Sequence, residues 1–244
     1  MKKNKISIIT VTKNSEKFLE KNILSVSNQK YRNYEHIIID GKSTDKTIEI
    51  IKRHKKKIKK FISEKDKNLY EAMNKGIKLA TGDIIGILNS DDIYFRNTLE
   101  IVNNYFSKNS KLDFLFGSVY KHKLLHGYYP KKISWTFGFY STHSVGFFIR
   151  KKSHKKVGFY NTKYKYSSDY DLFYRMIVKK KMIGQATKKN EIFGKFRSGG
   201  ISSNLKYIDF LRECNQIRID NGQKKIWVYL IFLIRFLKNI RRVF

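Results

Sequence analysis

The sequence predicts an α/β fold with a mostly parallel, doubly wound central sheet. In roughly the first hundred residues, short runs of β-branched residues alternate with segments whose apolar residues recur at helical spacing. Such alternation is typical of β-α-β units, which build a parallel sheet with helices on both faces. Several of the runs end in polar or acidic residues. Because ligands bind beyond the carboxyl ends of such strands, these residues are candidates for a functional site.

Strands are predicted at four places in this first part of the chain. They cover residues 6–12, 34–40, 60–63 and 83–92. Helices are predicted between them, the first capped by Asn14 or Ser15 and the third ended by Thr81 and Gly82. The sequence has no Walker-type phosphate loop and no Gly-x-Gly-x-x-Gly motif, so it does not support a standard ATP or dinucleotide site.

The stretch 83–92 is the most informative of these strands. Its apolar run predicts a strand buried on both faces, and it ends abruptly in Asn89, Ser90, Asp91 and Asp92. Two adjacent carboxylates favour a hard divalent cation that also carries substrate phosphates. The alternative is that Asp91 and Asp92 cap the helix that begins near Phe95.

The second half is less regular. Strands are predicted within residues 112–120, 144–150 and 191–196, and a helix is predicted over 169–179. Tyr and Phe are frequent in residues 127–140. These aromatic side chains either pack in the core or stack on sugar rings.

Composition bounds the class of protein. A chain of 244 residues predicts one sizeable domain, alone or with an appendage. A single cysteine, Cys214, excludes a disulfide framework, and the first residues lack the apolar stretch of a secretory signal, so a cytoplasmic location is expected. The net charge of +32 either attracts polyanions or reflects a general bias toward Lys, Asn and Ile.

The C-terminal part differs from the rest. Residues 226–237 are apolar except for Arg235, a segment too short to span a bilayer, which takes roughly 20 apolar residues. No acid lies among the cations around it, which are Lys224, Lys225, Arg235, Lys238, Arg241 and Arg242. This pattern predicts a helix at the membrane interface. The alternative is a helix packed on the body of the protein or on a second subunit of a homodimer.

Four motifs occur in a recognisable order. They are residues 7–14, 39–45, 63–83 and 88–92, with weaker matches at 143–148 and 168–172. In this order they resemble the family 2 glycosyltransferases, inverting enzymes with the GT-A fold. The resemblance covers most of residues 6–180. It implies a catalytic domain over 1–205, with a nucleotide-binding half (1–100) and an acceptor-binding half (101–205), followed by the membrane-associating helical tail (206–244).

The resemblance also implies a reaction. We expect a metal-dependent, inverting transfer of one sugar from a nucleotide-sugar, by analogy a UDP-sugar, to a hydroxyl of a glycan or polyprenyl-linked acceptor in bacterial surface polysaccharide synthesis. The Gln-x-x-Arg-Trp signature of processive synthases is absent, which favours single additions. The enzyme would then work in the cytoplasm, peripherally on the inner face of the cell membrane.

Site residues follow from the matched motifs. Binding of the nucleotide-sugar is expected from Thr10, Thr12, Asn14, Asp40, Asp66, Asn74, Lys75 and Asp91. Asp92, with Asp91, is expected to hold Mn²⁺ or Mg²⁺ bridging the diphosphate. Asn89 stands where many relatives carry Asp, which removes an acid near this metal site.

The catalytic base is expected at Asp169, with Asp171 as the second choice. Ser168 stands where the family usually has Glu, which leaves the choice between the two acids open. An acid at the start of a helix is also stabilised by the helix dipole, so Asp169 has a structural alternative. Tyr70 and His143 are expected near the donor or acceptor, although a lone His is more often structural.

Two other classes of function fit parts of the sequence. A nucleic-acid-binding protein would use the charge of +32 but would leave the carboxylates at the strand ends unexplained. A catalytically silent relative would keep the fold as a scaffold.

Overall fold

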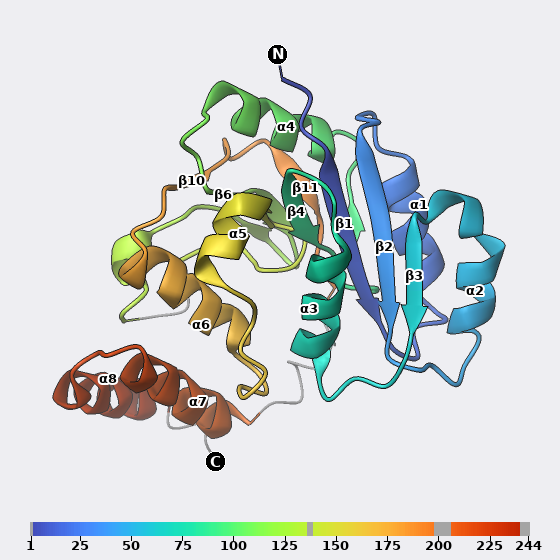
Figure 1. The fold of residues 1–244 in the computed structure, drawn as a ribbon. Coiled ribbons are helices and arrows are strands. Elements are labelled where there is room, and N and C mark those ends of the chain that lie inside the picture. Colours follow the sequence, from blue (N-terminus) through green and yellow to red (C-terminus); the bar gives the residue numbers. More distant parts are fainter. Residues whose placement is uncertain (1, 136–138, 198–205, 240–244) are drawn as a thin grey trace.

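The computed structural model describes residues 2–135, 139–197 and 206–239. A seven-stranded sheet in the order β10-β6-β9-β4-β1-β2-β3 forms its centre (Figure 1). The strands are β1 Ile6–Thr12, β2 Tyr34–Asp40, β3 Lys60–Ser63, β4 Ile84–Ile87, β6 Phe114–Phe116, β9 Phe147–Arg150 and β10 Gly184–Ala186. Only β9 runs against its neighbours β4 and β6. The prediction of a mostly parallel central sheet is therefore confirmed.

Helices cover both faces of this sheet (Figure 1). They are α1 Leu19–Ser27, α2 Thr47–Arg53, α3 Leu69–Leu79, α4 Thr98–Lys108, α5 Lys151–Val157, α6 Ser168–Tyr174, α7 Tyr207–Asp220 and α8 Lys225–Lys238. The alternation of side chains along β2 separates the two faces, because Ile38 packs with α1 and α2 while Ile37 and Ile39 pack with α3. All seven residues of β1 are buried, as expected for a central strand.

A second, four-stranded sheet lies beside the first, in the order β5-β11-β7-β8. Its strands are β5 Ile93–Tyr94, β11 Ile192–Lys195, β7 Ser118–Tyr120 and β8 Leu124–Leu125. The single strand predicted within 112–120 is thus wrong, because the chain leaves one sheet at Gly117 and enters the other. A Cβ atom at Gly117 would lie 2.2 Å from the ring of Phe193, so only glycine fits at this crossing.

Three predicted helix ends are corrected by the structure. The first helix begins at Leu19, and neither Asn14 nor Ser15 caps it with a side chain. Asn14 has a positive φ of 48°, a left-handed conformation that Asn tolerates better than most residues. Ala80, in extended conformation, ends α3 in place of Thr81 and Gly82. The fourth helix begins at Thr98, after Asn97, so Asp91 and Asp92 do not cap it.

Short non-α helices complete the chain. They are the 3₁₀ helices η1 Lys55–Lys57 and η2 Pro130–Lys132 and the π-helix η3 Arg175–Lys179, which continues α6. The helix predicted over 169–179 is therefore α-helical only in its first part.

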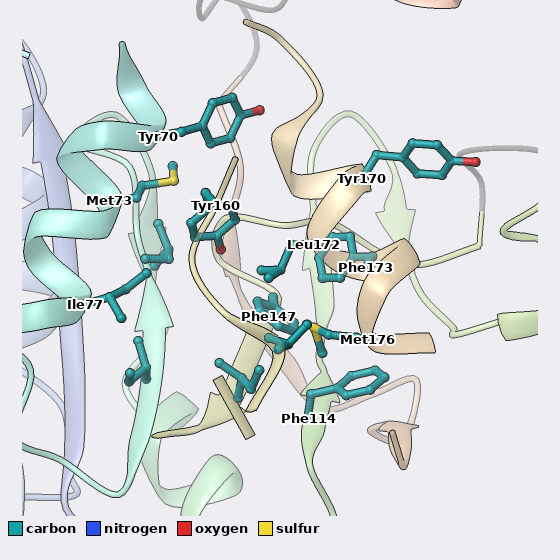
Figure 2. Close-up of a cluster of buried hydrophobic side chains, with 14 of the residues drawn as sticks. Tyr70, Met73, Ile77, Phe114, Phe147, Tyr160, Tyr170, Leu172, Phe173 and Met176 are labelled. Atoms are coloured by element: carbon teal, nitrogen blue, oxygen red, sulfur yellow. The ribbon is translucent and has the colours of Figure 1, made fainter. Parts of the chain in front are cut away.

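The main core fills the space between α3, the sheet and α6 (Figure 2). Met73 and Ile77 from α3 face Leu172, Phe173 and Met176 from the α6 segment (Figure 2). Tyr128, Phe139 and Tyr140 pack into this core, with Tyr128 and Tyr140 both against the ring of Phe116. For these three aromatic residues, core packing is therefore the correct alternative. Tyr129 and Trp135, in the same 127–140 segment, are exposed. Residues 136–138 of the segment lie outside the described residues.

Helix α7 packs on α6, and helix α8 packs on α7. Arg218 Nε in α7 donates to the hydroxyl of Tyr170 in α6 at 2.8 Å. Cys214 of α7 is buried, with its Sγ 3.9 Å from the hydroxyl of Ser167. Among the described helices, none combines the length and the apolar character needed to cross a membrane.

Candidate active site

The loops at the carboxyl ends of β1 and β2 are joined by hydrogen bonds. The backbone N–H of Asn14 donates to Ser43 Oγ at 2.8 Å, and the Asn14 side-chain oxygen accepts from the N–H of Thr44 at 2.9 Å. Asn14 therefore lies at the predicted edge of the sheet, where it holds two loops together.

Asp40 ends β2 and is fully buried. Its carboxylate accepts from the backbone N–H of Ser43 at 3.0 Å, from the Ser43 hydroxyl, and from Ser63 Oγ at 2.6 Å. Asp40 thus fixes the end of β2 to the end of β3. A nucleoside base would reach this carboxylate by replacing one of the serine hydroxyls.

Lys75 and Asp66 form an ion pair at the same edge. The Lys75 Nζ lies 2.7 Å from Asp66 Oδ1 and 2.7 Å from Glu64 Oε1. The hydrogen bond that Lys75 donates to Asp66, followed by the one it donates to Glu64, raises the pKa of the Lys75 ammonium. Asp66 Oδ2 is buried and has no hydrogen-bond partner among the described residues. It is therefore available to a ligand donor.

The two aspartates after β4 have different surroundings. Asp92 is buried, and its carboxylate accepts from Ser144 Oγ at 2.6 Å and from the backbone N–H of Arg197 at 2.9 Å. Burial raises its pKa to about 7. Asp91 has a side chain 22% exposed, and its nearest cation is Arg197, with Nη1 3.8 Å from Asp91 Oδ2. Asp91 is thus the more exposed of the two predicted metal ligands.

Arg197 is a site residue that the sequence analysis missed. Its guanidinium carbon lies 3.6 Å from the centre of the Phe18 ring, close enough for a cation–π contact. It is brought beside Asp91 by the antiparallel pairing of β11 with β5, in which Lys195 faces Ile93. No local motif indicates this contact, because 105 residues separate Arg197 from Asp92.

The turn after β4 fits a divalent cation bound together with phosphates. Asn89 Oδ1 is buried without a hydrogen-bond partner in the described structure, and Asp91 follows two residues later in the same turn. Oxygen atoms of this kind suit Mg²⁺ or Mn²⁺. The described residues contain no cluster of three or more His, Cys, Asp or Glu side chains that could hold an ion alone.

Asp169 lies in the first turn of α6 and is partly exposed. Oδ1 accepts from the backbone N–H of Tyr170 at 2.9 Å, and the hydroxyls of Tyr70 and Tyr140 lie 3.4 and 3.2 Å from its oxygens. Tyr70 comes from the start of α3, which follows the carboxyl end of β3. These contacts hold the carboxylate at the same edge of the sheet as Asp66.

Asp171 is engaged elsewhere. It is buried, its Oδ2 accepts from Arg175 Nε at 2.9 Å, and its Oδ1 accepts from Asn221 Nδ2 at 2.9 Å. Asn221 thus ties α6 to the end of α7, while Arg175 lies one turn further along the same helical segment. The geometry therefore favours Asp169 over Asp171 as the base.

Two other predicted site residues, Thr10 and Asn74, form hydrogen bonds with neighbouring protein groups. Thr10 Oγ1 contacts Asn22 Oδ1 at 3.1 Å and His36 Nε2 at 2.9 Å in a buried network below the edge. Asn74 exchanges two hydrogen bonds of 2.9 Å with the backbone of Tyr160. The hydroxyl of Thr10 and the side-chain amide of Asn74 are thus engaged by the protein.

Two further predicted residues remain near the site. Thr12, at the end of β1, has a buried hydroxyl without a partner among the described residues. His143 Nε2 lies 2.6 Å from the Tyr160 hydroxyl, and its ring stacks on Phe147. Burial lowers the His143 pKa, although the nearby Asp169 opposes this. Burial thus favours the neutral form of the imidazole, which packs against aromatic rings.

Comparison with known proteins identifies the family. The profile described as Glycosyl transferase family 2 matches residues 7–187. An uncharacterised glycosyltransferase of Methanocaldococcus jannaschii is 31% identical over 192 residues, which are 72% of this chain and 66% of that protein. The UDP-Glc:alpha-D-GlcNAc-diphosphoundecaprenol beta-1,3-glucosyltransferase of Escherichia coli is 33% identical over 114 residues, or 46% of this chain and 45% of the relative. The chain thus spans less than half of that relative.

Solved structures share the fold. S. aureus TarS 1-349 in complex with UDP-GlcNAc has a TM-score of 0.71 at 17% identity, with 96% of this chain and 73% of that chain covered. The mannosyltransferase of Pyrobaculum calidifontis, in complex with GDP-Man and Mn²⁺, has a TM-score of 0.64 at 15% identity. The match covers 98% of this chain and 65% of the mannosyltransferase chain. The chain therefore belongs to glycosyl transferase family 2 and has the GT-A fold.

Proposed function

We propose that this glycosyltransferase moves one sugar from a nucleotide-sugar, preferably a UDP-sugar, to an acceptor hydroxyl with inversion. The observation that carries the proposal is that two carboxylates remain available at one edge of the sheet. Asp91 follows β4, and Asp169 is held by the hydroxyls of Tyr70 and Tyr140. The nearby acids Asp92 and Asp171 are buried, whereas Asp91 and Asp169 are partly exposed.

Asp169 would act as the general base. An inverting transfer needs a carboxylate that removes the proton of the acceptor hydroxyl while the hydroxyl attacks the anomeric carbon. The Tyr170 N–H and the two tyrosine hydroxyls fix the orientation of this carboxylate. Its partial exposure leaves room for the acceptor to approach.

Asp91, with the Asn89 side-chain oxygen, would hold Mn²⁺ or Mg²⁺ at the diphosphate. When bound, such an ion stabilises the negative charge that develops on the departing nucleoside diphosphate. Arg197 lies beside Asp91, so its guanidinium would contact the same phosphates. Asp66 and Asp40, at the ends of neighbouring strands, would accept hydrogen bonds from the nucleoside, with Thr12 beside them.

The acceptor would be a glycan or a polyprenyl-linked sugar in bacterial surface polysaccharide synthesis. The name of the Escherichia coli relative gives a sugar on diphosphoundecaprenol as its acceptor, and this supports a lipid-linked acceptor here. An enzyme with such an acceptor would work at the inner face of the cell membrane.

Nucleotide release from UDP-, GDP- and dTDP-sugars tests the proposal. With Mn²⁺ and a suitable acceptor, we expect release from one donor, and we expect EDTA to reduce it strongly because the diphosphate loses its counter-ion. The Asp91→Asn variant should need more Mn²⁺ for half-maximal rate. Unchanged release in EDTA would contradict the metal assignment. Failure to bind any of these nucleotides, together with salt-dependent nanomolar to micromolar binding of DNA or RNA, would favour the nucleic-acid alternative.

A further inference from the structure

Helix α8 presents an apolar surface that nothing in the described structure covers. Val228 and Ile231 are buried, but the opposite side of the helix is exposed. The α8 face consists of Ile226, Trp227, Leu230, Leu233, Ile234 and Leu237, each between 45% and 67% exposed, with Tyr229 at its margin. Ile226, Leu230, Leu233 and Leu237 follow the i, i+4, i+7, i+11 spacing of a single helical stripe.

The charges around the α8 face have one sign. Lys224, Lys225 and Lys238 flank it, whereas Arg235 lies on the buried stripe of Val228 and Ile231; no Asp or Glu occurs after Asp220 in the chain. Arg241 and Arg242 add to this charge in the sequence but lie outside the described residues. An apolar helical face with Trp and Tyr, bordered by cations, complements the surface of an anionic bilayer.

Hydrogen bonds connect the α7–α8 pair to the segment that carries Asp169. Helix α7 contacts α6 and helix α8 contacts α7, and Figure 1 shows this pair at the end of the molecule toward which β1, β2 and β3 point. Asn221, between α7 and α8, donates to Asp171 in α6 at 2.9 Å. Glu213 of α7 accepts from the N–H of Tyr166 at 2.9 Å, and the Tyr166 carbonyl accepts from Tyr70, which contacts Asp169. The α7–α8 pair is thus bonded directly to the segment that carries the base.

We propose that α8 docks on an anionic lipid bilayer, with the α8 face inserted in the interface, and that this docking turns the Asp169 end of the molecule toward acceptors in the bilayer. The orientation of Asp169 toward acceptors rests on the proposed function, whereas the docking of α8 on the bilayer does not. A helix lying in the interface plane buries such a face without crossing the membrane.

Sedimentation with lipid vesicles tests docking without any need for activity. We expect the chain to bind phosphatidylglycerol vesicles, to bind phosphatidylcholine vesicles much more weakly, and to lose binding as salt is raised. Leu230→Ser/Leu233→Ser should lower binding more than about tenfold. The matched control Phe159→Ser/Ile183→Ser changes two equally exposed apolar residues away from α8 and should bind as the parent does.

The role of the flanking cations is tested in the same way. Lys224→Gln/Lys225→Gln/Lys238→Gln should lower binding by about two orders of magnitude at low salt, since each lysine near the surface contributes about fivefold. The control Lys55→Gln/Lys56→Gln/Lys57→Gln removes the same charge from the exposed helix η1 and should bind nearly normally. Equal losses in both triple variants would show general attraction of a basic protein and would overturn the proposal.

Trp227 gives a direct signal from the α8 face. In a Trp135→Phe background it is the only tryptophan, and its fluorescence should shift to the blue on vesicle binding. If the chain instead forms a dimer that Leu230→Ser/Leu233→Ser dissociates, and no vesicle shifts this emission, the face is a protein interface and the proposal is wrong. The α8 variants should keep transfer to a water-soluble acceptor and lose transfer to an acceptor in vesicles. Absence of transfer to either acceptor would count against the proposed function alone.

Discussion

Asp169 and Asp171 stand two residues apart in α6, yet their surroundings differ. Asp171 is neutralised by Arg175 and bonded to Asn221, and so joins α6 to α7. Asp169 faces tyrosine hydroxyls and no cation within ion-pair distance in the described structure. The helix spacing explains this, because neighbours at i and i+2 project from different sides of a helix. Local sequence could nominate both acids, but it could not distinguish them.

Replacing each aspartate in turn distinguishes the proposed base, Asp169, from Asp171, which stabilises the fold. Asp169→Asn should lower kcat by about 10²- to 10⁴-fold with little change in donor KM, because proton removal is lost while the donor site stays intact. Steady-state kinetics with a fixed acceptor measures this. Asp171→Asn, as the control, should lower the melting temperature and keep most of the activity per folded molecule. The opposite pattern would make Asp171 the base.

Arg197 provides a second prediction at this scale. Arg197→Gln should raise donor KM or Kd by about 10- to 100-fold, since hydrogen bonds to charged groups contribute about 1.5–3 kcal/mol. Titration of a nucleoside diphosphate with Mn²⁺ measures the change. The control Arg53→Gln removes an exposed arginine that pairs with Glu20 and should leave affinity unchanged. Equal affinity of the two variants would remove Arg197 from the donor site.

At the scale of elements, α3 packs closely on β1. A Cβ atom on Gly76 would lie 2.3 Å from Cγ2 of the fully buried Ile9. This contact holds α3, which carries Tyr70 and Lys75, close to the sheet. The helical spacing of the apolar residues in α3 is visible in the sequence, whereas the closeness of the packing is not.

Gly76→Ala tests this contact. Alanine should improve helix propensity by about 1 kcal/mol, but overpacking against Ile9 costs about 1–3 kcal/mol, so a net loss of about 1 kcal/mol is expected. Urea unfolding measures it. Gly41→Ala, where the nearest atom is Lys13 Cδ at 3.3 Å, should change stability by less than about 0.5 kcal/mol. A stabilised Gly76→Ala variant would contradict the packing argument.

The sequence predicted the elements that depend on local patterns and missed those that depend on distant partners. The four strands of the first part and the order of helices follow from apolar spacing, which the sheet retains. The division at Gly117 depends on Phe193, far along the chain, and the contact of Arg197 with Asp91 depends on the pairing of β11 with β5. For the same reason, Thr10 was expected at a ligand, although Asn22 and His36 already engage its hydroxyl.

For the whole molecule, stability depends on buried neutral histidines. Burial lowers the pKa of His36 to about 3 and that of His154 to about 4, from 6.5. Because the unfolded chain then binds protons that the folded chain does not, stability is complete above about pH 6.5 and falls as pH decreases toward these values. These two histidines should therefore destabilise the folded protein progressively as the pH falls below about 6.5.

Comparison with His36→Gln measures this dependence. Between pH 7 and pH 4 the parent should lose about 3 kcal/mol more than the variant, at about 1.4 kcal/mol per pH unit below 6.5. Denaturant unfolding at several pH values gives both curves. Parallel curves would mean that His36 is not held neutral in the folded protein.

The burial of Cys214 has a practical consequence for spectroscopy. The chain has one cysteine, it lies inside between α7 and α6, and burial raises the pKa of its thiol. Such a thiol reacts slowly, because the thiolate is the reactive form. A cysteine introduced on the outer surface can thus take a spin label or a dye selectively, while the native sulfhydryl is left in place.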